Sequence, residues 1–488
     1  MKSKLGARTS CHQHNQGMAE NTIITRVLTS VQQLDAQIWN ALLALQPTPT
    51  PFMRREYLAA MEQSGSADAH TGWVSRVITV WDGGELLAAC PLYLKSHSYG
   101  EYVFDWAWAR AYQQHGLPYY PKAVLAVPFT PVPGTRLMAR SQSLRMALVK
   151  AVQQWAQDEQ LSSLHLLFGD AQDLQACQAS GWMQRSTVQF HWTNVAPTLP
   201  TACGSLPPEG AQSALGRPGG GLRPPTPPTA CESLTTDRGE STLGRPGGGL
   251  VAPTPVQWRD FDDFLASLQQ EKRKKIRQER RKVHDAGVRF RTLQGHEIST
   301  ADWDFFYRCY ERTYLEHGNP PYLTPEFFAA MRETMPENWV MFIAEHEQRP
   351  IACSLIAITA DCTDISTSNI AQSNQEQALS AIKNKVAYGR YWGALERVDS
   401  LHFEACYYQP IEWCIANGYH RFEGGAQGEH KMARALLPVE TPSAHWVAHP
   451  AFADAIARFL QREGEGMADY FEALQSHSPL RQQPAQRP

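Results

Sequence analysis

The sequence lacks the motifs of several common protein classes. Its ten cysteines include no CxxC pair, which argues against a zinc ribbon and against a thioredoxin-type dithiol. No segment approaches the ~18 uninterrupted apolar residues of a membrane span, and the first residues contain no apolar run of signal-peptide length. A Walker phosphate loop and a GxSxG nucleophile elbow are also missing. We therefore expect a cytoplasmic protein with reduced cysteines and no transmembrane segment.

The chain also has little net charge. Its 45 Lys and Arg residues nearly balance 48 Asp and Glu residues, which gives a net charge of −3. A generally basic nucleic-acid-binding protein is therefore not expected, although a local basic patch is compatible with this balance. Apolar residues make up 43% of the 488 residues, enough for sizeable cores in two or three domains.

A repeat of 28 residues occupies residues 197–252, and the segment LGRPGGGL occurs in both copies. Because the copies are rich in Pro, Gly, Ser and Thr, they cannot bury an apolar core, and we predict a disordered insertion. Further segments are predicted to be a disordered leader, a polar loop insertion and a disordered tail: residues 1–21, 360–386 and 466–488. Since the leader is polar, translation could start at Met1 or at Met18.

The repeat insertion separates two parts, residues 22–196 and 253–465, with the same order of predicted elements. Each part has helices, a strand hairpin, a further strand, a helix and another strand. In the first part, Leu28–Leu45 is predicted to be a helix, and Asp82-Gly83-Gly84 predicts a hairpin turn. We therefore predict an α+β fold in which a mixed, mostly antiparallel sheet flanked by helices is used twice. A cleft between the copies would be a natural binding site.

Four aromatic residues alternate along the first part, namely Tyr102, Phe104, Trp106 and Trp108. On a strand they would share one face and could form a stacking wall for a substrate. Polar or aromatic partners lie nearby in the sequence: His97, Glu101, Asp105, His115, Tyr120 and Lys122. An ordinary aromatic core with charges at its rim fits the pattern equally well.

The segment Ala126–Leu137, AVPFTPVPGTRL, leads from a predicted strand toward a helix that starts near Ser141. Free backbone N–H groups and the helix dipole at such a junction favour an anion, and Arg136 would add a positive charge. A plain connection with Ser141 as the helix cap is the alternative.

A basic run occupies Glu271–Val283, which contains eight Lys or Arg residues. On a helix these residues cover most faces, and such a run is usually a solvated surface. Lys272–Lys282 could instead contact a polyanion such as tRNA or a lipid diphosphate.

The second part contains a predicted helix, Leu401–Asn417, whose apolar stripe includes Cys406 and Tyr407. His402 and Glu404 lie off this stripe, near the helix start. Pro410 removes an internal hydrogen bond, so a kink is expected.

A glycine-rich loop, Gly424–Gly428, follows the next predicted strand and allows close backbone approach. It leads into Glu429, His430 and Lys431, which suit proton transfer and anion binding. A solvated surface turn is the alternative. No metal site is expected, because His445-x-x-x-His449 has no acid between its histidines and runs into a proline.

Seven segments of the chain form a recognisable set: KSHSYGEYVFDWAWARAY, AVPFTPVPGTRL, QFHW, EKRKKIRQERRKV, YGRYWG, LHFEACYYQ and EGGAQGEHKMAR. Together they resemble the FemAB-like bacterial predicted N-acyltransferases of the GNAT superfamily, often labelled peptidoglycan biosynthesis or recognition proteins. The resemblance covers roughly residues 22–196 and 256–463. It implies two tandem GNAT-like (acyl-CoA N-acyltransferase) domains.

The resemblance also implies transfer of an acyl group from a thioester donor to the amine of a small molecule or peptide. The co-substrate would be an acyl-CoA or an aminoacyl-tRNA, with no tightly bound cofactor. The candidate catalytic residues are Glu404, His402 and His430. The candidate donor-binding residues are Gly134, Thr135, Arg136, Arg390 and Lys431. The candidate acceptor-binding residues are His97, Glu101, Asp105, Trp106, Tyr120, Gln427 and Glu429.

The usual GNAT pyrophosphate signature, Gln/Arg-x-x-Gly-x-Gly/Ala, is missing outside the repeat insertion. Three functions therefore stay open: an acyl-CoA-dependent N-acyltransferase, an aminoacyl-tRNA-dependent transferase acting on a peptidoglycan precursor, and a non-catalytic protein that binds cell-wall fragments. For the enzyme, we predict that Glu404 and Lys431 share one site. Glu404 would take the amine proton, while Lys431 would bind a donor phosphate or the developing oxyanion.

Deletion of residues 197–252 tests the prediction of a disordered insertion. Because loop closure depends only weakly on loop length, the deletion should change the free energy of unfolding by on the order of 1 kcal/mol. Thermal unfolding of the shortened chain would measure this change. Loss of the cooperative transition would show that the segment contributes to the fold.

Overall fold

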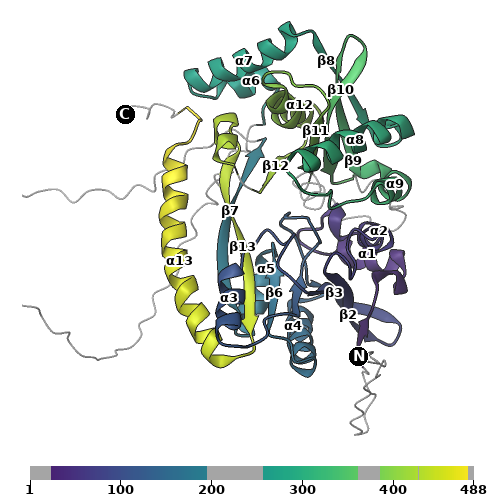
Figure 1. The fold of residues 1–488 in the computed structure, drawn as a ribbon, viewed down its shortest axis with the longest axis vertical. Helices are drawn as coiled ribbons and strands as arrows, with labels where there is room; N and C mark the ends of the chain where they lie inside the picture. Colours follow the sequence, from purple (N-terminus) through teal and green to yellow (C-terminus); the bar gives the residue numbers. More distant parts are fainter. Residues whose placement is uncertain (1–22, 195–256, 361–384, 427, 482–488) are drawn as a thin grey trace, which may run out of the picture. The chain divides into compact units, whose positions relative to one another are not determined.

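The computed structural model describes residues 23–194, 257–360, 385–426 and 428–481. Within these ranges one 13-stranded mixed sheet has the order β1-β2-β3-β4-β6-β13-β7-β12-β11-β10-β9-β8, with β5 paired to β3 beside this path (Figure 1). The predicted leader, the repeat insertion and most of the polar loop insertion lie outside the described residues.

The first part of the chain starts the sheet with an antiparallel meander of β1, β2 and β3. The predicted turn between β2 and β3 is confirmed, since Asp82 pairs with Glu85 across it and Gly83 has a positive φ of 57°. β4 then pairs antiparallel with β3 and parallel with β6. The strands are β1 (Ile23–Leu28), β2 (Trp73–Asp82), β3 (Glu85–Lys95), β4 (Lys122–Leu125), β5 (Met138–Ala139) and β6 (Ser163–Leu167).

The second part repeats this arrangement. Its first four strands pair antiparallel in sequence order, and the fourth, β11, pairs parallel with β12. The strands are β8 (Val288–Gln294), β9 (Trp339–His346), β10 (Arg349–Ile358), β11 (Val386–Ala394) and β12 (Arg421–Ala426). The predicted α+β fold with two tandem GNAT-like halves is thereby confirmed.

The last strand of each half is exchanged with the other half. β7 (Met183–Thr193) pairs antiparallel with β12 of the second half, while β13 (Leu437–Val447) pairs antiparallel with β6 of the first half. At the centre, β7 and β13 pair with each other from His191–Leu437 to Met183–His445. The two halves therefore share one continuous sheet.

Helices accompany both halves of the sheet. In the first half they are α1 (Ala36–Ala44), α2 (Arg55–Gln63), α3 (Trp106–Gln114), α4 (Gln142–Asp158) and α5 (Ala171–Ala179). In the second half they are α6 (Phe261–Ala266), α7 (Gln270–Asp285), α8 (Thr300–Glu316), α9 (Pro325–Thr334), α11 (Leu401–Phe403), the π-helix η6 (Glu404–Tyr408), α12 (Gln409–Ala416) and α13 (Pro450–Ser476). Short 3₁₀ turns are η1 (Val31–Gln33), η2 (Pro51–Met53), η3 (Gly295–Glu297), η4 (Pro336–Asn338) and η7 (Glu429–Arg434).

One apolar core joins the two halves. Alternate residues of β9 point to opposite faces of the sheet, and Met341 and Ile343 belong to a cluster that also contains residues of α1, α2, α8 and α9. In this cluster Phe52 packs against Tyr388 with 5.2 Å between ring centroids, and Tyr57 packs against Phe327 at 5.3 Å. Burial of each such side chain stabilises the fold by roughly 1.5–3 kcal/mol.

The predicted helix Leu28–Leu45 is wrong in its first part. Strand β1 extends to Leu28, and the helix begins only at Ala36 after the cap residue Asp35. The Asp35 carboxylate accepts hydrogen bonds from the backbone N–H groups of Gln37 and Ile38, which defines the helix start. Leu28 belongs to β1 instead, where it pairs with Val77 of the distant strand β2.

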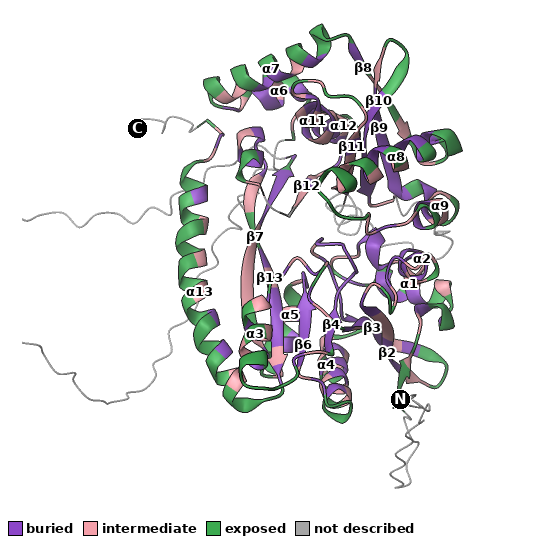
Figure 2. Cartoon of the chain, viewed as in Figure 1, coloured by how far each residue is buried: buried purple, intermediate pink, exposed green. Residues whose placement is uncertain are grey.

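The predicted disordered tail is also wrong as far as the structure describes it. Helix α13 continues to Ser476 beside β7 and β13, with its outer face exposed (Figures 1 and 2). Buried Leu460 and Leu474 anchor it. Beyond the helix, the backbone of Arg481 donates to the carbonyl of Ser267 at 2.9 Å. Packing against the exchanged strands therefore supplies the stability that the local sequence lacks.

A buried histidine pair lies where β13 enters the first half. His165 and His445 are direct cross-strand neighbours, and their Nδ1 atoms are 2.8 Å apart. In such a contact one Nδ1–H donates and the other Nδ1 accepts, so both rings cannot be charged together. Burial, together with the charge of Arg185, lowers the pKa of His445 to about 3. Burial likewise lowers the pKa of His165, together with the nearby charge of Lys122.

These depressed pKa values predict acid sensitivity. The unfolded chain binds protons below pH ~6.5 that the folded pair cannot bind, so stability should fall as the pH drops from 6.5 toward 4. At pH 5 one such imidazole should cost roughly 2 kcal/mol. The variant His445→Asn should lose stability less steeply over this range, as measured by urea unfolding at several pH values.

The comparison with the wild type is essential, because buried acids titrate in the same window with the opposite sign. Burial raises the pKa of both Glu101 and Asp173 to about 7. These groups are unchanged in the variant, so they cancel in the difference. Parallel pH profiles for the two proteins would contradict the assignment to the histidine pair.

Candidate functional site

The parallel strands β11 and β12 diverge toward their carboxyl ends. In their described parts, Val386–Tyr388 pair with Arg421–Glu423, and the ladder ends there although both strands continue. A cavity of about 150 Å³ lies at the opening and is called the β11–β12 cavity below. It is lined by Ser354, Leu355, Ile356, Gly389, Arg390, Tyr391, Trp392, His402, Cys406, Tyr407, Phe422, Gly424 and Lys431.

Arg390 occupies a bulge in β11. Leu355 pairs with Tyr391 and Ile356 with Gly389, so Arg390 has no direct partner on β10. Its guanidinium Nη2 donates to the carbonyl of Phe129 at 3.1 Å. Arg390, predicted to bind the donor, thus borders the cavity but also holds a loop of the first half.

A π-helical turn forms the helical wall of the cavity. Pro410 has no N–H, so a carbonyl of the preceding turn loses its helical partner. The hydroxyl of Ser354 donates to the carbonyl of Ala405 at 2.6 Å. The kink predicted at Pro410 therefore takes the form of the π-helix η6, which places Cys406 and Tyr407 against the cavity. Sequence periodicity assigned both residues to the apolar stripe and gave no sign of this role.

His402 lies in the lining as a neutral imidazole. Burial, together with the nearby His430, Arg434 and Lys431, lowers the pKa of His402 to about 4. Its ring packs edge-on against Trp392, with 5.5 Å between centroids. A neutral imidazole can accept a proton from a substrate amine.

Lys431 is a buried amine in the same lining. Burial lowers the pKa of its ammonium to about 8. Its Nζ donates to the carbonyl of Gly425 at 3.0 Å. Gly424 packs closely against Leu436, since a Cβ at this position would lie 2.3 Å from the Leu436 side chain.

Glu404 lies in a different cavity from Lys431. Its carboxylate accepts from Arg280 at 3.1 Å and from Gln409 at 2.8 Å, and it lines a cavity of about 630 Å³ beside α7. Burial raises the pKa of Glu404, while the charge of Arg280 opposes that rise. The structure therefore does not bring Glu404 and Lys431 into one site.

The other predicted residues of this region are dispersed. His430 is hydrogen-bonded through Nε2 to the Tyr407 hydroxyl at 3.2 Å, at the edge of the β11–β12 cavity. Glu429 accepts from the hydroxyl of Tyr470 on α13 at 2.7 Å. Gln427 lies outside the described residues.

The predicted anion site of the first half is closed by the protein's own groups. Arg136 is buried, and its guanidinium donates to the carbonyls of Gly134 at 3.1 Å and Val132 at 2.5 Å. Thr135 donates to Asp170, and the backbone N–H of Arg136 donates to Asp173 at 2.6 Å. A phosphate here would meet two carboxylates, so the geometry is that of a plain connection.

The alternating aromatic segment is not a strand. Trp106 begins helix α3, and Glu101 and Asp105 precede it as buried partners of Lys122. The ammonium of Lys122 donates to Glu101 at 2.7 Å and also to Asp105. Burial opposes ionisation of Asp105, but the charge of Lys122 prevails and lowers the pKa of this carboxyl.

Trp106 and Tyr120, two predicted acceptor-binding residues, do lie together. They line an open groove of about 830 Å³ formed by α3 and the loop that follows it. His97 is not in this lining, and its ring packs against Tyr99 at 5.3 Å. The groove therefore combines part of the predicted set with apolar surface.

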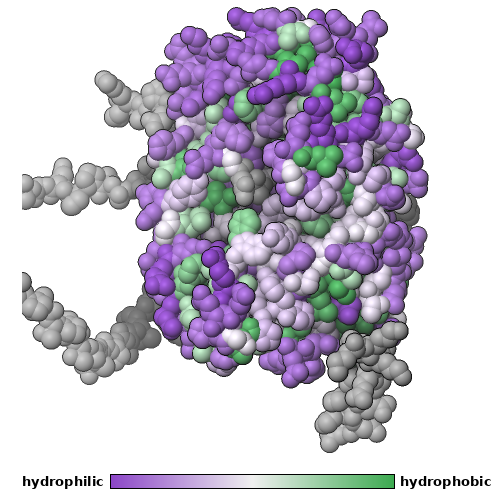
Figure 3. Space-filling view, viewed as in Figure 1, coloured by the Kyte–Doolittle hydropathy of each residue, from purple (hydrophilic) through white to green (hydrophobic). Residues whose placement is uncertain are grey.

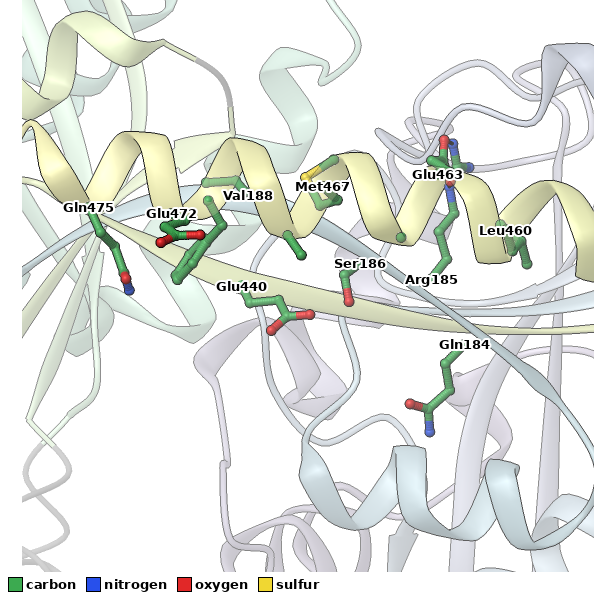
Figure 4. A pocket seen from close by; sticks show the side chains of 13 residues that line it. Gln184, Arg185, Ser186, Val188, Glu440, Leu460, Glu463, Met467, Glu472 and Gln475 are labelled. Atoms are coloured by element: carbon green, nitrogen blue, oxygen red, sulfur yellow. Dashed lines mark hydrogen bonds and ion pairs between the residues drawn. The ribbon is translucent and has the colours of Figure 1, made fainter. Parts of the chain in front are cut away.

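A further groove of about 340 Å³ runs between α13 and the exchanged strands (Figure 4). Its lining includes Val188 of β7, Met467 and Phe471 of α13, and the ion pair Arg185–Glu463 at 2.7 Å. No sequence pattern predicted this groove, because α13 was not expected to extend so far.

Helix α7 presents many cations to solvent. The region where it lies, at the top of the view, is mostly hydrophilic (Figure 3). Within this surface Arg280 binds Glu412 at 2.6 Å and Lys282 binds Asp399 at 2.7 Å. Exposed side chains of the helix include Lys274, Lys275, Arg277 and Arg281.

The described ranges contain no group of three or more His, Cys, Asp or Glu side chains arranged to hold a metal ion. In the same ranges, no helix combines the length and the apolar character needed to cross a membrane.

The chain belongs to the FemAB-like family, described as peptidoglycan biosynthesis/recognition, which matches residues 30–198, 254–363 and 367–482. The predicted family is thereby confirmed, and membership supports a transferase connected with peptidoglycan. No functionally curated protein matched the chain in a sequence comparison.

Solved structures of similar fold share little sequence with the chain. FemX is 9% identical over 87% of this chain and 98% of its own, with a TM-score of 0.46. L-PGS from Bacillus licheniformis is 8% identical over 87% and 97%, with a TM-score of 0.42. A tandem GNAT protein from the clavulanic acid biosynthesis pathway is 11% identical over 88% and 99%, with a TM-score of 0.37. At these scores the similarity carries no argument about substrate or mechanism.

Burial of Lys431 predicts unusual reactivity. Its amine should become half-reactive toward an acylating reagent near pH 8, rather than near the ordinary 10.5, because burial disfavours the charged form. Competitive labelling across a pH series, followed by peptide mass spectrometry, measures this value. The labelling of exposed Lys274 in the same sample serves as the reference for how the reactivity of the reagent changes with pH. Half-labelling near pH 10.5 would show that the amine is fully hydrated.

Proposed function

We propose that this protein is an N-acyltransferase that passes an acyl group from a thioester donor, such as an acyl-CoA, to an amine in the β11–β12 cavity. The observation that carries the proposal is the divergence of two parallel strands around a cavity that contains a neutral imidazole and a buried amine. Backbone groups of β11 beyond Tyr388 are no longer paired with β12, so they can bind an extended acyl donor.

The reaction would use these groups in a single displacement. The neutral amine of the acceptor attacks the thioester carbon, a C–N bond forms, and the C–S bond breaks to release the thiol. Backbone N–H groups near Tyr391–Gly393 and the ammonium of Lys431 would stabilise the developing oxyanion. The proton passes from the attacking amine to the imidazole of His402, which then gives it to the departing sulfur so that the free thiol leaves.

His402 fits the role of base better than the other two candidates. Its pKa is low enough to keep the ring neutral at physiological pH, and it lies in the cavity lining. The carboxylate of Glu404 is held by Arg280 and Gln409 in another cavity. His430 shares a hydrogen bond with Tyr407 and is not among the residues that line the cavity.

An aminoacyl-tRNA donor with a peptidoglycan precursor as acceptor is the second candidate. The exposed cations of α7, within Lys272–Lys282, favour it because they could contact phosphates without disturbing the ion pairs of Arg280 with Glu404 and Glu412. Affinity for RNA through such contacts would fall steeply with salt concentration, whereas binding of a single acyl-CoA would change less. The salt dependence of donor binding therefore distinguishes the two donors.

The variant His402→Ala should keep the fold and reduce turnover by roughly 10²–10⁴-fold, the usual contribution of a general base. Release of free thiol from a panel of acyl-CoA donors, with a panel of amine acceptors, measures turnover. The exposed histidine variant His70→Ala is the matched control and should retain wild-type activity.

Two results would count against the proposal. Absence of binding for every acyl-CoA tested would exclude this donor class and favour the tRNA-dependent alternative. Normal turnover in His402→Ala together with a large loss in Glu404→Gln would show that Glu404, in the cavity beside α7, is the general base.

A further inference from the structure

The basic helix α7 contains one acid that is turned inward. Within this helix, which the structure describes completely, Glu279 is buried with 8% of its surface exposed, whereas Glu271 and Asp285 are exposed. Its carboxylate is directed toward the segments that carry the polar residues of the β11–β12 cavity. Nothing in the sequence pattern singled out Glu279, because it lies within a run of cations.

One partner of Glu279 is Arg434, the last residue of η7. The Arg434 guanidinium donates to both carboxylate oxygens, at 3.1 and 3.0 Å, and to the carbonyl of His430 at 2.7 Å. Its guanidinium carbon also lies 3.6 Å from the ring centroid of Phe403, the neighbour of His402. Arg434 therefore connects η7, which carries Lys431, to the start of the cavity helix.

The other partner is Tyr408, the last residue of the π-helix η6, whose hydroxyl donates to Glu279. This π-helix carries Cys406 and Tyr407 of the cavity lining. One carboxylate therefore ties together η6, which supplies Cys406 and Tyr407 to the lining, and η7, which supplies Lys431.

Segment η7 has few constraints of its own. It is entered at Gly428 with φ 105° and left at Ala435 with φ 60°, so left-handed residues bound it at both ends. A short turn of this kind depends on side-chain contacts for its position. A buried ion pair is a costly way to gain stability, because well-packed apolar residues often do as well. An apolar pair could supply similar stability, but it could not fix the direction of Arg434, whose guanidinium binds both Glu279 oxygens and the carbonyl of His430.

We propose that Glu279 is a positioning residue that fixes Lys431 and His402 around the β11–β12 cavity through Arg434 and Tyr408. The inference deepens the proposed function and rests on it for the role of the cavity in catalysis. The placement of Lys431 by Glu279, however, can be measured without any substrate.

The decisive experiment compares Glu279→Gln with Glu271→Gln in the full-length protein. Both variants remove one negative charge from α7, but only the first breaks the ion pair with Arg434. In Glu279→Gln, η7 should loosen and Lys431 should gain water. The pH of half-labelling of Lys431 should then rise from about 8 by ~1 pH unit or more, while Glu271→Gln stays at the wild-type value.

Turnover gives a second readout. In Glu279→Gln the rate constant kcat should fall roughly 10²-fold, as expected when reacting groups are displaced by about an ångström, with a smaller change in KM. If Glu279→Gln does not fold, Tyr408→Phe removes one arm of the contact and should shift the labelling of Lys431 in the same direction. An unshifted labelling pH in a folded Glu279→Gln, or in Tyr408→Phe where the first fails to fold, overturns the inference. If the wild type has no turnover but the labelling shift occurs, the proposed function fails while the positioning by Glu279 stands.

Discussion

β7 and β13 pair side by side at the centre of the sheet, and each strand also borders the half of the chain to which the other belongs. Because of this exchange, neither half has a complete sheet of its own. The first half relies on β13 to cover β6, and the second half relies on β7 to cover β12. The histidine pair and the groove beneath α13 both lie along these exchanged strands.

Buried charges serve different purposes in the two halves. In the first half the buried charges bind other groups of the protein. Lys122 binds Glu101 and Asp105, while Arg136 donates from its backbone N–H to Asp173 and from its guanidinium to the carbonyl of Gly134. In the second half the strands diverge, and the side chains of His402 and Lys431 border a cavity. The same repeated strand order thus yields a structural framework in one copy and a candidate reaction site in the other.

The sequence predicted those structural features that depend only on residues close together in the chain. The Gly83 turn, the Ser141 cap of α4 and the break at Pro410 each follow from the conformation of a few residues. The strand exchange has no local signature, and helical spacing placed Glu404 off the apolar stripe without revealing its partner Arg280, 124 residues earlier. The predicted start of a disordered tail is wrong for the same reason, because α13 packs on β7, which lies far away in the sequence, as well as on β13.

The position of β13 in the chain has a consequence for synthesis on the ribosome. β6 ends at Leu167, but the strand that covers it ends at Val447 of the 488-residue chain. Until that strand is synthesised, the edge of β6 in the nascent first half has unpaired backbone hydrogen-bonding groups, and β7 lacks its partners β12 and β13. Completion of the fold is therefore a late event in translation.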